Sequence, residues 1–207
     1  MADQQELHPR RRIVYIPIIH ALSDMGELGG SVQRQRIAQF GRQSVARSAA
    51  AVERAWDEVE RAVRRLRVVP QGTRVYQDGL PVCEHEQEIV SSLAAAGSRN
   101  HKLLLELQDR GAILMGTESP DLLVEEYQVA MATFSQAKTP GTRDSQQQMK
   151  TTLLERRDRY IAGRIDQTLQ QSQMGILFIG ALHNTLKYLP PDIEIVHTAR
   201  TDRREKR

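Results

Sequence analysis

Chemically active side chains follow several of the most apolar stretches of this chain. His20 ends the stretch IVYIPIIH, Asp78 follows TRVYQ, Glu118 follows ILMGT, and His183 ends GILFIGALH. Imidazole nitrogens and carboxylate oxygens together suit a divalent cation such as manganese, iron or zinc. Without a metal, the same groups could act as a general acid and a general base.

In a metal site built from such residues, some side chains would bind the ion and others would transfer a proton. We expect His20, His183 and Glu118 to bind the ion, and Glu118 with one of Glu84 or Glu86 to serve as ligand or general base. A bound divalent cation lowers the pKa of a coordinated water molecule, so hydrolysis is the expected reaction class. The alternative for each histidine is an ordinary packing role at the end of a strand.

The apolar stretches are predicted to be strands. Residues 13–20 are continuous and β-branched rather than alternating, which is typical of a strand covered on both faces. The same interpretation applies to four shorter runs, residues 75–76, 113–116, 176–179 and 193–196. Segments with helical periodicity separate them, at residues 32–66, 86–96, 101–109, 121–136 and 145–171, and a turn or linker is expected at 138–144.

Strands that alternate with helices predict an α/β fold, with a mostly parallel central sheet of about five strands flanked by long helices. We expect residues 13–198 to form a single domain, between a flexible N-terminus at 1–12 and a basic tail at 199–207. The carboxyl ends of parallel strands lie at one edge of the sheet, where α/β proteins bind their ligands. The side chains that end the strands are therefore expected to share one site.

The composition limits the classes of function. The 29 basic and 26 acidic residues nearly balance, and the basic tail is predicted to be a solvated end, so nucleic acid is not the expected partner. The single cysteine, Cys83, excludes an internal disulfide framework and favours a cytoplasmic location. The apolar run at residues 13–22 is shorter than the roughly 20 residues that span a bilayer. No glycine-rich nucleotide fingerprint follows the first strand.

Two motifs in the second half of the chain support a family resemblance. Gly180-Ala181-Leu182-His183 ends an apolar strand, and a long helix carrying Glu155-Arg156-Arg157-Asp158 precedes it. With these motifs in this order, the chain resembles the erythromycin esterase, ChaN and TraB superfamily, whose members pair an early Gly-x-x-His motif with a late one. The resemblance implies that the site residues are the early histidine His20, the acids Glu84 or Glu86 and Glu118, the helical arginine Arg157, and the late histidine His183.

The same resemblance implies hydrolase or metal-dependent peptidase chemistry in some members and haem or iron handling in others. A small-molecule or peptide substrate would then bind at the sheet edge, with Arg157 holding its anionic group. The early motif departs from the family pattern, because Pro17-Ile18-Ile19-His20 has proline in place of glycine, which fixes φ and removes an amide donor. A non-catalytic binding or interaction module with a degenerate site is therefore the alternative. The apolar stripe of residues 32–66 could also pair with a second subunit in a homo-oligomer.

Overall fold

The computed structural model describes residues 10–19, 34, 37–39, 41–136 and 142–198. Within these residues, the strands form one five-stranded sheet in the order β3-β2-β4-β1-β5, and all neighbouring strands are parallel. The strands are β1 (Arg11–Ile18), β2 (Thr73–Gln77), β3 (Ile113–Met115), β4 (Met174–Gly180) and β5 (Ile193–His197). The predicted α/β fold with a parallel sheet is confirmed.

The central position of β4 organises the sheet. Leu177 of β4 pairs with Tyr15 of β1 on one side and with Tyr76 of β2 on the other. β4 is buried from Gly175 to Gly180 because helices cover both faces of the sheet. A run such as ILFI fits this position, since β-branched and aromatic side chains pack well on a pleated surface that water does not reach.

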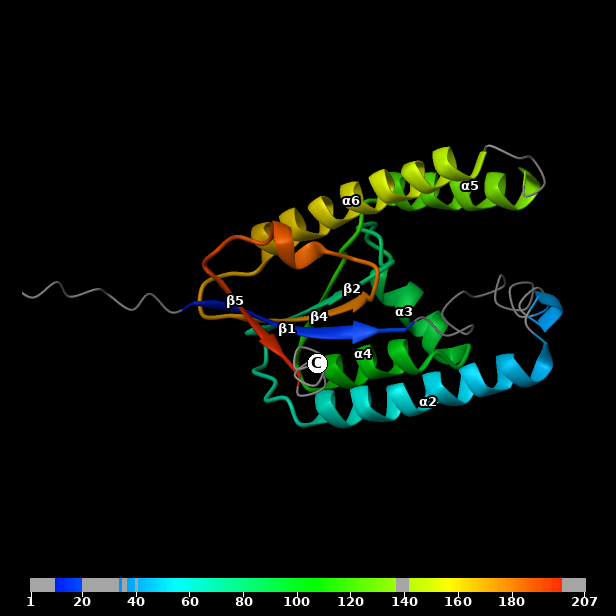
Figure 1. The fold of residues 1–207 in the computed structure, drawn as a ribbon. Coiled ribbons are helices and arrows are strands. Elements are labelled where there is room, and N and C mark those ends of the chain that lie inside the picture. Colours follow the sequence, from blue (N-terminus) through cyan, green and yellow to red (C-terminus); the bar gives the residue numbers. More distant parts are fainter. Residues whose placement is uncertain (1–9, 20–33, 35–36, 40, 137–141, 199–207) are drawn as a thin grey trace, which may run out of the picture.

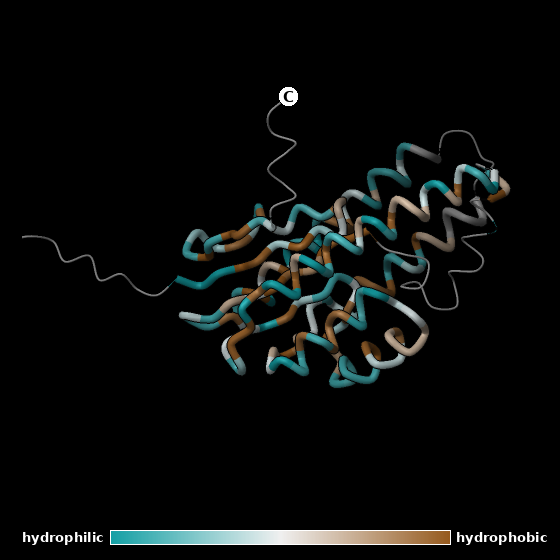
Figure 2. The backbone as a smooth tube through the Cα atoms, turned by 90° about the horizontal axis from the view of Figure 1, so that it is seen from below, coloured by the Kyte–Doolittle hydropathy of each residue, from teal (hydrophilic) through white to brown (hydrophobic). Residues whose placement is uncertain are grey.

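Helices cover the two faces unequally (Figure 1). The helices α2 (Arg42–Arg64), α3 (Glu86–Ala95) and α4 (Arg99–Asp109) lie on one face, where Trp56 and Leu104 pack against β-strand residues such as Phe178. On the other face α6 (Thr142–Thr168) packs Ile161 and Ile165 against the sheet, and α5 (Pro120–Gln136) lies beside α6. In Figure 2 the helices alternate between teal and brown, as amphipathic covering helices should, and brown stretches run through the sheet between them.

Several predicted boundaries need correction. β1 begins at Arg11, two residues earlier than predicted, because the Arg11 guanidinium is buried and pairs with Asp192 and Asp166. α6 begins at Thr142, inside the predicted linker, and ends at Thr168 rather than Gln171. The predicted helix at 101–109 begins at Arg99, and His101 is buried in its first turn, where its Nδ1 lies 2.7 Å from the hydroxyl of the N-cap residue Ser98.

None of the described helices combines the length and the apolarity that crossing a membrane requires. A short 3-10 helix, η2 (Thr185–Tyr188), follows β4 and lies against α6. This contact brings the residues after β4 next to the middle of α6, which is where the candidate site forms.

Candidate metal centre at the carboxyl edge of the sheet

Three side chains from three different connections meet at the carboxyl edge of the sheet. Asp78 follows β2, Glu118 follows β3, and His183 follows β4, and each offers a ligand atom within 4.8 Å of the others. All three side chains are buried: their exposed fractions are 4%, 0% and 5%. This group of two carboxylates and an imidazole could hold a metal ion.

The backbone places Asp78 directly beyond the last residue of β2. Its amide donates to the carbonyl of Phe178 in β4, so that the ladder continues one residue past the strand. Gly79 then turns the chain with a φ of 79°, in the left-handed region that glycine adopts most readily. The Asp78 side chain therefore stays at the edge of the sheet, where its Oδ2 accepts a hydrogen bond of 2.9 Å from the amide of Gly180.

Glu118 is held by the loop that follows Gly79. The amides of Thr117 and Glu118 both donate to the carbonyl of Leu80, and the carbonyl of Glu118 accepts from the amide of Val82. The Glu118 side chain also accepts a hydrogen bond of 3.0 Å from the amide of Gly79. The connections after β2 and β3 thus form one unit that fixes both carboxylates.

Arg157 of α6 joins the two carboxylates through one guanidinium. Its Nε and Nη2 donate to the two oxygens of Glu118 at 2.8 and 2.5 Å, and the same Nη2 donates to Oδ1 of Asp78 at 2.9 Å. Its Nη1 donates to Glu126 of α5 at 2.6 Å. Burial lowers the pKa of Arg157, but its pairing with these carboxylates outweighs burial and leaves that pKa above its usual value.

His183 lies between two carboxylates. Its Nδ1 is 2.8 Å from Oδ1 of Asp158, and its Nε2 is 3.4 Å from Oδ1 of Asp78. Asp158 is itself fixed, because it accepts hydrogen bonds from the amide of Asn184 and the hydroxyl of Thr185. Asp158 therefore sets the orientation of the imidazole and directs Nε2 toward Asp78.

The electrostatics of the group follow from this burial and pairing. Burial lowers the pKa of His183, but its hydrogen bonds to Asp158 and Asp78 outweigh burial and raise that pKa to about 9. Burial raises the pKa of Glu118, although pairing with Arg157 opposes the effect. Burial also acts to raise the pKa of Asp158, but the hydrogen bond from His183 and its other partners leave it lowered. Without a metal, His183 is therefore an imidazolium at neutral pH.

Glu84 and Glu86, two of the predicted site residues, lie outside this group. Glu84 is exposed, with a φ of 65°, and Glu86 lies in the first turn of α3, where its carboxylate accepts a hydrogen bond from the amide of Cys83. Neither belongs to the group of Asp78, Glu118 and His183. His20 lies outside the described residues, as does the basic tail at 199–207.

Asp158 has a role that the sequence did not assign to it, although a signal was present. The apolar stripe of α6 steps by four from Leu153 to Ile161 and Ile165, and position 157 in the middle of that stripe is an arginine. A charge on a buried stripe requires buried partners, and the adjacent Asp158 is likewise buried. Arg157 and Asp158 are the buried residues of the ERRDR segment, whose other residues are exposed.

Comparisons with known proteins give no further guidance: no protein-family model matches the chain, and no curated protein or solved structure shows significant similarity to it.

Proposed function

We propose that this protein is a metal-dependent hydrolase whose ion is bound by Asp78, Glu118 and His183. The observation that carries the proposal is the arrangement around His183, which has a carboxylate on each ring nitrogen. Histidine ligands of metals commonly donate their second N–H to a carboxylate, which fixes the tautomer and the orientation of the ring. Asp158 occupies that position, and Nε2 is the nitrogen left to bind an ion.

The charges of the buried group also favour a cation. Asp78, Glu118 and Asp158 bring three carboxylates, whereas Arg157 and a protonated His183 bring two positive charges. Buried charges are stable when they are paired, so one negative charge needs a proton or a further cation. Burial raises the pKa of Glu118, which favours a proton on its carboxylate. A divalent ion such as manganese, iron or zinc would supply the missing positive charge in place of that proton.

A divalent ion in this position would supply a coordinated water with a lowered pKa. Glu118 would act as a ligand, because burial raises the pKa of its carboxyl in the metal-free protein and a bound cation would neutralise the carboxylate. Asp158 would keep the orientation of the His183 ring fixed during the reaction. The resemblance to the erythromycin esterase, ChaN and TraB group supports the same reaction class, with a small molecule or a peptide as substrate.

The experiment is a metal titration of protein stripped with EDTA, with Mn²⁺, Fe²⁺ and Zn²⁺ added separately and binding followed by calorimetry and by the melting temperature. We expect at least one ion to bind and to raise the melting temperature. His183→Ala should remove this effect, and the matched control His85→Ala should not, since His85 is exposed at the start of α3. If no ion binds the wild-type protein, the proposal is wrong.

A second candidate function has its own supporting observation. Arg157 already pairs with Asp78 and Glu118, so one further proton would balance the charge of the group without an ion, as in a binding module with a degenerate site. The proline in Pro17-Ile18-Ile19-His20 favours the same alternative. The titration discriminates between the two, because a degenerate site predicts no shift of the melting temperature with any of the three ions.

A further inference from the structure

Arg157 and a metal ion would need the same oxygen atoms. The Oδ1 atom of Asp78 lies 3.4 Å from Nε2 of His183, so it faces the centre of the candidate metal group. That same atom accepts the hydrogen bond from Nη2 of Arg157, and Nη2 also pairs with Oε1 of Glu118. One guanidinium nitrogen therefore bridges the two carboxylates in the way that a metal ion would.

Glu126 offers Arg157 another place to bind. Its carboxylate accepts from Nη1, on the side of the guanidinium away from Asp78, and it is half-exposed on α5, with 49% of the side chain accessible. Arg157 itself is buried, with 6% of its side chain accessible. A pairing with Glu126 alone would keep the arginine neutralised while it releases the two inner carboxylates.

We propose, building on the metal site proposed above, that Arg157 is an internal competitor for that site, and that metal entry transfers the guanidinium from Asp78 and Glu118 to Glu126. In the metal-free protein Arg157 neutralises the buried carboxylates and keeps the fold stable. In the metal-bound protein the ion takes over that pairing. The arginine thereby sets the metal concentration at which the site fills.

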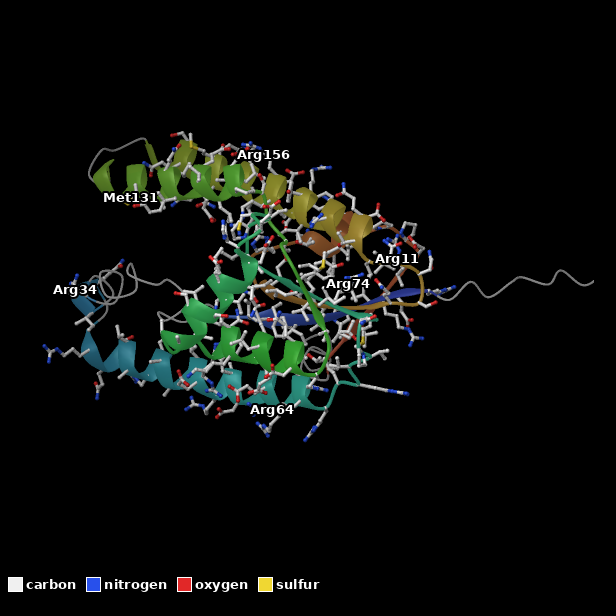
Figure 3. The ribbon with its side chains drawn as sticks, turned by 180° about the vertical axis from the view of Figure 1, so that it is seen from behind. Arg11, Arg34, Arg64, Arg74, Met131 and Arg156 are labelled. Atoms are coloured by element: carbon white, nitrogen blue, oxygen red, sulfur yellow. The ribbon has the colours of Figure 1, made fainter. Side chains whose placement is uncertain are left out.

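The neighbouring pair Arg156 and Glu125 provides a matched control. Arg156 lies next to Arg157 on α6 and also pairs with a glutamate of α5, at 2.7 Å, but this pair is exposed. Figure 3 shows Arg156 on the outer side of the helix pair, away from the sheet. Loss of this pair removes a bridge between α5 and α6 without touching the buried carboxylates.

The test measures Zn²⁺ and Mn²⁺ affinity by calorimetry for Arg157→Met and Glu126→Gln, with Arg156→Met and Glu125→Gln as controls. Arg157→Met should bind the ion at least about tenfold more tightly than wild type, because no charged donor has to be displaced. It should melt at a lower temperature in EDTA and recover when the ion is added. Glu126→Gln should bind about three- to fivefold more weakly, because the displaced arginine loses its partner. Both controls should match wild type.

Each other outcome has a definite meaning. Equal or weaker metal affinity in Arg157→Met overturns the competition but leaves the metal site intact. Should Arg157→Met fail to fold, Glu126→Gln decides, and an affinity equal to or tighter than that of wild type overturns the proposal. Absence of binding in wild type and in every variant overturns the metal site itself, and the competition with it.

Discussion

Oδ1 of Asp158 on α6 lies 2.8 Å from Nδ1 of His183, which follows β4 and is 25 residues further along the chain. A residue of α6, which covers the sheet, thus fixes the side chain of His183, which follows the central strand β4. Asp158 does not belong to the candidate ligand group, so its contribution can be tested separately from theirs.

Asp158→Asn should lower the pKa of His183 from about 9 toward its ordinary value of 6.5, because the neutral amide no longer stabilises the imidazolium. The measurement is an NMR titration of the His183 ring protons in EDTA. Metal affinity should fall by about tenfold or more in the same variant, as is typical when the carboxylate behind a histidine ligand is lost. An unchanged pKa would show that Asp158 does not hold the proton on this ring.

The stability of the metal-free protein should depend on pH through His183. Its pKa is raised in the folded state, so the protonated ring stabilises the fold fully below pH 6.5, and this contribution is lost as pH rises toward 9. The loss should be on the order of 3 kcal/mol in the free energy of unfolding. Urea denaturation at pH 6.5, 7.5 and 9 measures it, and His183→Gln should flatten the profile.

Metal affinity should show the opposite dependence on pH. An ion can bind Nε2 of His183 only after the imidazolium loses its proton, so the apparent association constant should rise about tenfold per pH unit between pH 6.5 and 8. Calorimetry in two buffers with different ionisation enthalpies should show a proton released for each ion bound. Affinity that does not vary with pH would place the ion away from His183.

Gly116→Ala should destabilise the fold and disturb the placement of Glu118. A Cβ at this position would lie 2.8 Å from Cα of Val82 and 2.9 Å from the carbonyl oxygen of Pro81, and these are backbone atoms that cannot move cheaply. We expect a loss of about 1–3 kcal/mol in the free energy of unfolding.

The control for this variant is Gly163→Ala in α6, where a Cβ meets nothing within 4 Å. That change should stabilise the protein by about 0.5–1 kcal/mol, because alanine is the better helix former. Chemical denaturation of both variants checks the two opposite signs. A Gly116→Ala variant as stable as wild type would mean that the loops after β2 and β3 are less tightly joined than described.

The sequence predicts β1 and β4 well because both lie in the interior of the sheet and are largely buried. A strand in that position must be a continuous apolar run, and runs such as IVYIPI and ILFI stand out from amphipathic helices. The alternation of strands and helices then predicts a parallel sheet. Because the carboxyl ends of parallel strands lie at one edge, Asp78, Glu118 and His183 are expected at that edge. The predicted proximity of these three side chains is a consequence of topology.

The sequence could not select among neighbouring acids. Glu84 and Glu86 lie within a few residues of Asp78, but the turn at Gly79 redirects the chain along the end of β3 and carries both away from the group. It also could not show that Arg157 and Asp158 are buried, because the same charged pattern is common on solvated helices. The first question depends on the turn after β2, and the second depends on how α6 packs against the sheet, for which the arginine in its apolar stripe is only an indirect signal.

The place of β4 at the centre of the sheet has a consequence for how the molecule assembles. β1 and β2 are not neighbours, and each depends on β4, which the chain supplies much later. During synthesis, the apolar residues of β1 and β2 are therefore exposed before β4 is available to pair with them. Folding that depends on contacts so distant in the sequence is expected to be slow. His183 is synthesised directly after β4, so a nascent chain gains the last member of the candidate metal group only when the sheet itself can close.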